Sequence, residues 1–68
     1  MQILATLTLD NGTTMVAKAG AVDDFAIYLV EEGGNPNSEN LAKASRYEPK
    51  AVAFRTLVEE TTGRWYRF

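Results

Sequence analysis

Apolar and polar residues alternate at the start of the chain. Within residues 2–10, the odd positions carry the apolar side chains Ile3, Ala5, Leu7 and Leu9. Thr6, Thr8 and Asp10 fall on the opposite side. A period of two is typical of a strand that buries one face, so a strand is predicted here.

The sequence Asp-Asn-Gly at residues 10–12 predicts a tight turn into a second, antiparallel strand. A two-residue loop would bring Lys18 onto the apolar face. A three-residue loop with Gly12 in the left-handed conformation instead pairs Leu7 with Met15 and keeps that face apolar. We therefore predict an N-terminal hairpin with the three-residue loop.

Residues 21–32 fit two patterns. A helix would align the apolar side chains of Val22, Phe25, Ala26, Leu29 and Val30. The acidic pair at residues 23–24 suits a helix start, and the two glycines at 33–34 suit its end. The run Phe-Ala-Ile-Tyr-Leu-Val at 25–30 has strong strand propensity. We predict a helix, with a strand as the alternative.

The C-terminal segment also fits two patterns. Pro49 and Gly63 stand where a helix over residues 49–62 would begin and end. The alternation of apolar residues from Val52 to Val58, followed by a turn at Gly63, fits a hairpin equally well. Its second strand would turn Tyr66 and Phe68 toward the buried face. We predict the hairpin, with the helix as the alternative.

Together these elements predict an α+β fold, in which the N-terminal and C-terminal hairpins form a small antiparallel sheet packed on one central helix. A chain of 68 residues is expected to form a single domain over residues 1–68. Its longest apolar run, residues 25–30, is far shorter than the roughly 20 residues that span a bilayer. The opening residues lack the basic start of a signal peptide. We expect a cytoplasmic protein that does not enter the membrane.

The composition argues against catalysis. The chain contains neither cysteine nor histidine, which excludes disulfides, thiol nucleophiles, zinc fingers and Ser-His-Asp triads. Adjacent acidic pairs such as Glu31 and Glu32 point apart on either a helix or a strand, so they do not form an acid/base pair. The two glycines at 33–34 are not followed by the residues of a phosphate-binding loop. We expect no enzymatic activity, no metal and no cofactor.

Charge is unevenly distributed along the chain. Residues 1–40 carry six acidic residues and one lysine, a net charge of −5, whereas residues 41–68 carry six basic and three acidic residues, a net charge of +3. All the arginines lie in the second part. Such asymmetry either holds the two parts of one fold together or marks an interaction surface.

The predicted C-terminal hairpin offers a candidate partner-binding surface. Its outer face would present Arg55, Leu57, Trp65 and Arg67. Tryptophan and arginine are enriched where interfaces concentrate their binding energy. The alternative is that Trp65 forms the centre of the core. A secondary charged surface, suited to steering a basic partner, would consist of Asp23, Asp24, Glu31 and Glu32.

These features predict a non-enzymatic binding module, an accessory, adaptor or inhibitor protein that acts through protein–protein interaction. One alternative is a single-stranded nucleic-acid binder using Arg55, Arg64 and Arg67 with stacking aromatics, although a pI near 4.9 disfavours a polyanion. Another is a homo-oligomeric structural protein, a homodimer paired through an exposed strand edge. Residues 13–19, with Lys18 as the only charge, are the candidate edge.

Overall fold

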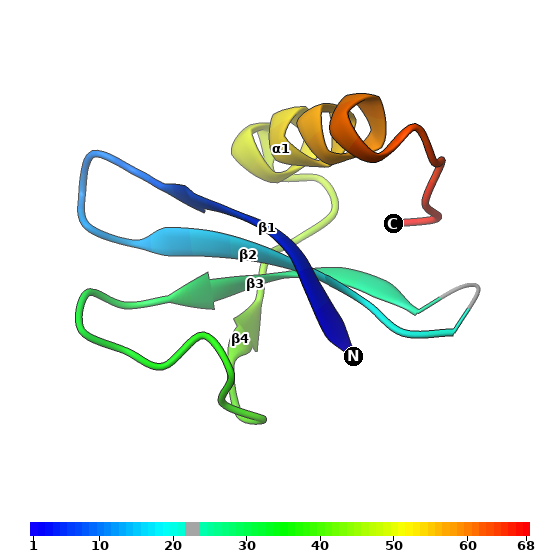
Figure 1. Ribbon diagram of the computed structural model, residues 1–68. Helices are drawn as coiled ribbons and strands as arrows, with labels where there is room; N and C mark the ends of the chain where they lie inside the picture. Colours follow the sequence, from blue (N-terminus) through cyan, green and yellow to red (C-terminus); the bar gives the residue numbers. More distant parts are fainter. Residues whose placement is uncertain (22–23) are drawn as a thin grey trace.

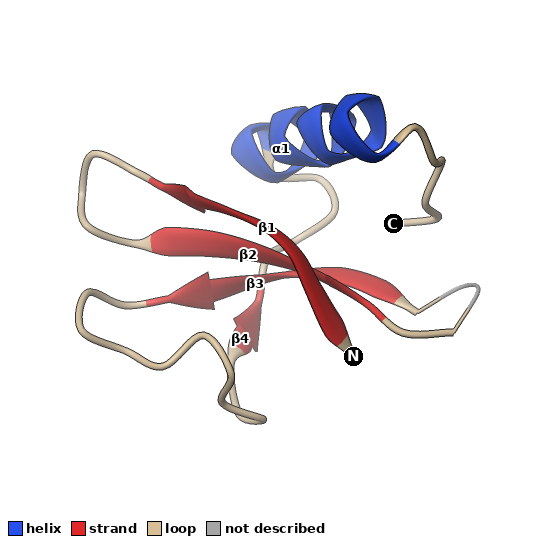
Figure 2. Ribbon diagram, viewed as in Figure 1, coloured by secondary structure: helices blue, strands red, loops and turns tan. Residues whose placement is uncertain are grey.

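The chain forms a four-stranded antiparallel sheet and one helix, described by a computed structural model over residues 1–21 and 24–68 (Figure 1). The strands follow one another across the sheet in chain order. The elements are β1 (Gln2–Thr8), β2 (Thr14–Ala19), β3 (Phe25–Val30), β4 (Ala42–Lys43) and α1 (Pro49–Thr62). Figure 2 shows α1 on one side of the sheet and the loop between β3 and β4 on the other. The predicted α+β class is confirmed.

The N-terminal hairpin is built as predicted. Leu7 pairs with Met15, and Ala5 pairs with Ala17. The amide of Leu9 donates to the carbonyl oxygen of Thr13 at 2.7 Å, which closes a three-residue loop. Gly12 has a φ of 89°, the left-handed conformation that this loop requires.

One residue of β1 departs from the expected alternation. Ile3 pairs with Lys18 while Ala5 pairs with Ala17, so Leu4 is an extra residue in the ladder. Such a bulge moves the residues before it to the other face of the strand. Ile3 therefore shares a face with Lys18 rather than with Ala5, and the prediction for Ile3 is wrong because a simple period of two contains no inserted residue.

The segment predicted as the central helix is a strand. β3 pairs with β2 along its whole length, from Ala19 opposite Phe25 to Thr14 opposite Val30. The aromatic and β-branched residues of this segment favour a strand, and β2 offers a free edge for it to join. Of the residues expected on the helix, Val22 and Asp23 lie outside the described residues. The same pairing places the predicted exposed edge, residues 13–19, in the interior of the sheet.

The segment predicted as the C-terminal hairpin contains the helix instead. α1 begins at Pro49, and the amide of Gly63 donates to the carbonyl oxygen of Glu59 at 2.9 Å. Gly63 has a φ of 70°, which ends the helix in a left-handed cap. The hairpin prediction is wrong because four strands before this segment already form the sheet, and one of its apolar faces still needs a cover, which a helix provides.

The main core lies between α1 and the sheet. Its buried side chains come from β2, β3, α1 and the chain end: Met15, Ala17, Phe25, Ile27, Ala51, Phe54, Val58 and Tyr66. On the opposite face, Val16 and Lys18 are also buried, and the Lys18 ammonium lies 3.5 Å from the carbonyl oxygen of Ser38. No helix in the described part of the chain is long and apolar enough to cross a bilayer.

A pair of threonine substitutions tests the helix over residues 49–62. Thr56 is exposed on α1, so Thr56→Ala is expected to raise the free energy of unfolding by about 0.5 kcal/mol, because alanine has the higher helix propensity. Thr8 is exposed on β1, and its hydroxyl lies 3.1 Å from that of Thr14. Thr8→Ala should lower the stability by roughly 0.2–1 kcal/mol through loss of this cross-strand pair. Urea denaturation measures both, and a loss of stability in Thr56→Ala would contradict the helix.

Candidate functional site: the C-terminal tail

The residues after α1 form a tail without regular secondary structure, in which the side chains of residues 65–68 alternate between solvent and core. Trp65 is 72% exposed, whereas Tyr66 is only 7% exposed. Arg67 is exposed, and Phe68 is partly buried against the core. The period of two in this segment was predicted, and so was the inward orientation of Tyr66 and Phe68. The tail thus turns Trp65 and Arg67 outward while its other side packs on the protein.

The tail is anchored by aromatic contacts to the first residue of β3. The ring of Tyr66 stacks on that of Phe25 with centroids 4.9 Å apart and an interplanar angle of 21°. The ring of Phe68 meets Phe25 edge-on, with centroids 5.7 Å apart. Such aromatic pairs add about 0.5–1.5 kcal/mol each beyond the burial of their surface. These contacts fix the tail, which follows the C-terminal end of α1, to the start of β3.

Glu59 joins the tail to the helix. Its Oε2 accepts a hydrogen bond from the backbone amide of Tyr66 at 2.9 Å, which satisfies a partly buried donor. Its Oε1 lies 3.9 Å from Nε of Arg55, one helical turn earlier. The guanidinium of Arg55 is also 6.0 Å from the ring centroid of Phe68. Arg55 therefore lies close to Phe68 of the tail, and its side chain is only 27% exposed to a partner.

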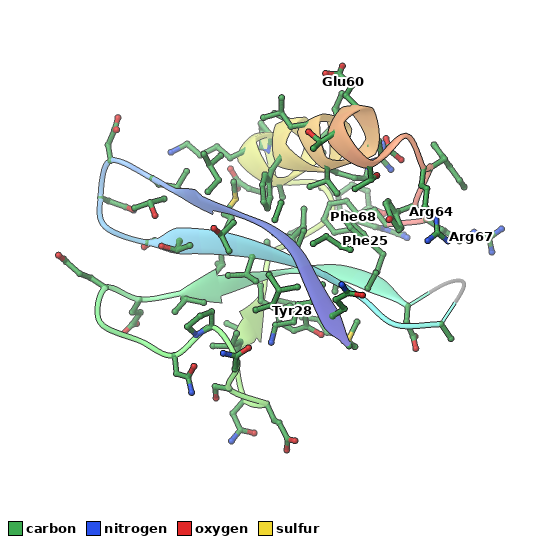
Figure 3. The ribbon with its side chains drawn as sticks, in the orientation of Figure 1. Phe25, Tyr28, Glu60, Arg64, Arg67 and Phe68 are labelled. Carbon is green, nitrogen blue, oxygen red and sulfur yellow. The ribbon has the colours of Figure 1, made fainter. Side chains whose placement is uncertain are left out.

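Three exposed side chains form the outer surface of the tail: Arg64, Trp65 and Arg67. We call these three residues the tail surface. Arg64 lies against the buried ring of Tyr66, with 5.7 Å between its guanidinium carbon and the ring centroid. Figure 3 shows Arg64 and Arg67 at the end of the molecule where Phe25 begins β3. Two guanidinium groups beside an indole can bind carboxylates and an apolar side chain together.

The structure brings together only part of the predicted partner-binding surface. Trp65 and Arg67 are both exposed, on the tail rather than on the predicted hairpin, and the alternative that Trp65 is the centre of the core is wrong. Arg55 and Leu57 point to different sides of α1, because residues two positions apart on a helix are rotated by about 200° around its axis. Leu57 lines a groove with Leu7 and is 52% exposed. It belongs to a different surface.

The predicted acidic surface is also divided. Asp24 precedes β3, whereas Glu31 and Glu32 follow its other end. At about 3.3 Å per residue, the strand separates them by roughly 20 Å. Asp23 lies outside the described residues. The prediction assumed a helix, which would have kept these side chains closer together.

Arg64 was missing from the predicted protein-binding surface, although the nucleic-acid alternative included it. The signal was present, because arginine stands on both sides of the aromatic pair at residues 65–66. The hairpin prediction concealed it, because neighbouring residues on the second strand of a hairpin point to opposite faces, which would turn Arg64 away from Trp65. In the structure residues 64–68 form no strand, and Arg64 and Trp65 are both exposed.

Comparisons with protein-family models, curated proteins and solved structures find no match to this chain.

Two neighbouring aromatic substitutions should separate anchoring from exposure. Tyr66→Ala is expected to lower the free energy of unfolding by about 3 kcal/mol, because it removes a buried ring that stacks on Phe25. Trp65→Ala should change it by less than about 0.5 kcal/mol, as for other exposed positions. Urea denaturation of both variants decides the matter, and a large loss in Trp65→Ala would place the indole in the core.

Proposed function

We propose that this protein is a non-catalytic binding module, an accessory, adaptor or inhibitor protein that engages a protein partner through its tail surface. The observation that carries the proposal is the exposure of Trp65. This large aromatic side chain is 72% exposed, although Tyr66 and Phe68 of the same tail pack into the protein. Exposed tryptophan flanked by arginine is the composition of interface hot spots.

Anchoring of the tail favours binding energetically. Tyr66 and Phe68 pack against Phe25, so the backbone that carries Trp65 is ordered before a partner arrives. A preorganised surface loses less conformational entropy on association than a free tail does. This supports the tail surface over other exposed aromatics, such as Tyr47, which is 76% exposed but lies in the segment before α1.

The expected partner surface is apolar at its centre and acidic at its rim. The indole would fill an apolar pocket, while Arg64 and Arg67 would meet carboxylates around it. The protein as a whole has a net charge of −2, which is unfavourable for a polyanion such as single-stranded nucleic acid. A chain without histidine or cysteine also supports a non-enzymatic role, and we place this role in the cytoplasm.

The test uses the full chain, immobilised and exposed to nuclease-treated lysate of its host, with bound proteins quantified by mass spectrometry. Trp65→Ala should reduce the capture of specific partners at least tenfold, since a hot-spot tryptophan contributes about 2 kcal/mol or more. Arg67→Glu should also weaken capture by opposing acidic groups on the partner. Tyr47→Ala, which removes another exposed aromatic ring, is the matched control and should capture the same proteins as the wild type.

The single tryptophan also reports on the nucleic-acid alternative. Addition of single-stranded oligothymidine to the protein at low salt should leave the fluorescence of Trp65 unchanged. Salt-sensitive quenching, or a capture profile that is the same for the wild type and Trp65→Ala, would contradict the proposed function.

A further inference from the structure

β1 forms one outer edge of the sheet and carries no charged residue. The strand order places β2 on one side of it and no strand of the described chain on the other. Its sequence from Gln2 to Thr8 is Gln-Ile-Leu-Ala-Thr-Leu-Thr. Edge strands of monomeric proteins are usually guarded by charges or prolines, because their free backbone groups can pair with another strand. β1 has neither a charge nor a proline, and its one irregularity, the bulge at Leu4, lies before the residues from Ala5 to Thr8.

The register of the hairpin shows which backbone groups of β1 point outward. Leu9 bonds to Thr13 across the loop, and hydrogen-bonded pairs alternate with non-bonded pairs along an antiparallel ladder. Ala5 and Leu7 therefore direct their amide and carbonyl groups toward β2. Thr6 and Thr8 direct theirs away from the sheet. Within the described residues, no hydrogen bond links these outward backbone groups to another part of the chain.

An apolar groove lies beside the same edge. Leu7 and Leu57 line it and are 39% and 52% exposed, respectively. The groove has a volume of about 280 Å³. Leu9 and Ala53 contribute to its apolar walls, and one acidic and one basic residue, Asp10 and Lys50, also line it. A largely apolar groove along a strand without charges or prolines combines the two surfaces that strand addition uses, backbone hydrogen bonds and side-chain packing.

We propose that a second copy of this chain pairs with β1 in antiparallel orientation, about a twofold axis at Leu7. Thr6 of each copy then faces Thr8 of the other, and the two pairs exchange four hydrogen bonds through the outward backbone groups. Leu7 faces its own counterpart, and Ala5 faces Leu9. The two sheets join into one continuous sheet.

The position of the axis follows from the irregularities at both ends of β1. An axis at Thr6 would place Thr8 opposite the extra residue Leu4, and an axis at Thr8 would place Thr6 opposite Asp10 in the turn. Only the axis at Leu7 uses both outward threonines while keeping apolar residues on one face. This self-complementarity is what a twofold interface requires, and it favours a second copy over an unrelated strand.

Dimerisation of this kind leaves the tail surface free. Leu7 lies near the end of β1 next to the hairpin loop, whereas the tail packs at the start of β3, the opposite end of the sheet. Each dimer would therefore present two tail surfaces. The inference does not depend on the proposed function, because it rests on β1 and α1 alone.

A charge-swap experiment tests the axis directly. Sedimentation equilibrium of the wild type should show a concentration-dependent species with twice the 7.5 kDa chain mass. Leu7→Lys and Leu7→Glu each place like charges opposite one another, so each should raise the dimer dissociation constant at least tenfold. An equimolar mixture of the two variants should dimerise again, because lysine then faces glutamate.

Val52→Lys is the matched control, because Val52 is 40% exposed on α1 but does not line the groove. It should dimerise like the wild type, and circular dichroism should show that all variants keep the fold. Amide hydrogen exchange adds an independent readout: Thr6 and Thr8 should become protected as the concentration rises, whereas Leu7 is protected throughout. A monomeric wild type, an unaffected Leu7→Lys dimer, or a mixture that fails to dimerise would overturn the proposal.

Discussion

The stacking of Tyr66 on Phe25 is the contact on which the candidate site depends. Phe25 begins β3, and Tyr66 belongs to the tail after α1, so this pair joins two segments that are far apart in sequence. Tyr66 is buried by this contact at 7% exposure, while its neighbour Trp65 is 72% exposed. Glu59 reinforces the arrangement by accepting the amide hydrogen bond of Tyr66. Packing and exposure in this segment are thus two results of one contact.

The fold also explains how an acidic protein can present a basic surface. The tail places Arg64 and Arg67 at one end of the sheet, while Glu31 and Glu32 follow β3 at the other end. The separation of the two sets along β3 keeps Glu31 and Glu32 away from the arginines, whereas Asp24 precedes Phe25 at the same end as the tail. Such an uneven field can orient an approaching partner, an effect that weakens as salt screens the charges.

Local sequence patterns were sufficient where a turn and an alternation agreed. The loop at Gly12 and the pairing of Leu7 with Met15 followed from keeping one strand face apolar. Residues 25–30 and 49–62 were predicted wrongly, because each segment fits a helix and a strand almost equally and only their packing partners decide between them. The candidate site was likewise predictable only in part. The alternation of the tail was predictable, but the separation of Leu57 from Trp65 required the helix.

Nuclear Overhauser spectroscopy of the full chain in solution tests the central claim most directly. The account predicts cross-peaks from the ring protons of Phe25 to those of both Tyr66 and Phe68, whose centroids lie 4.9 and 5.7 Å away. It also predicts none from Phe25 to the indole of Trp65. Cross-peaks between Phe25 and Trp65, together with none to Tyr66, would show that the tail packs with its opposite face and would remove the basis for the tail surface.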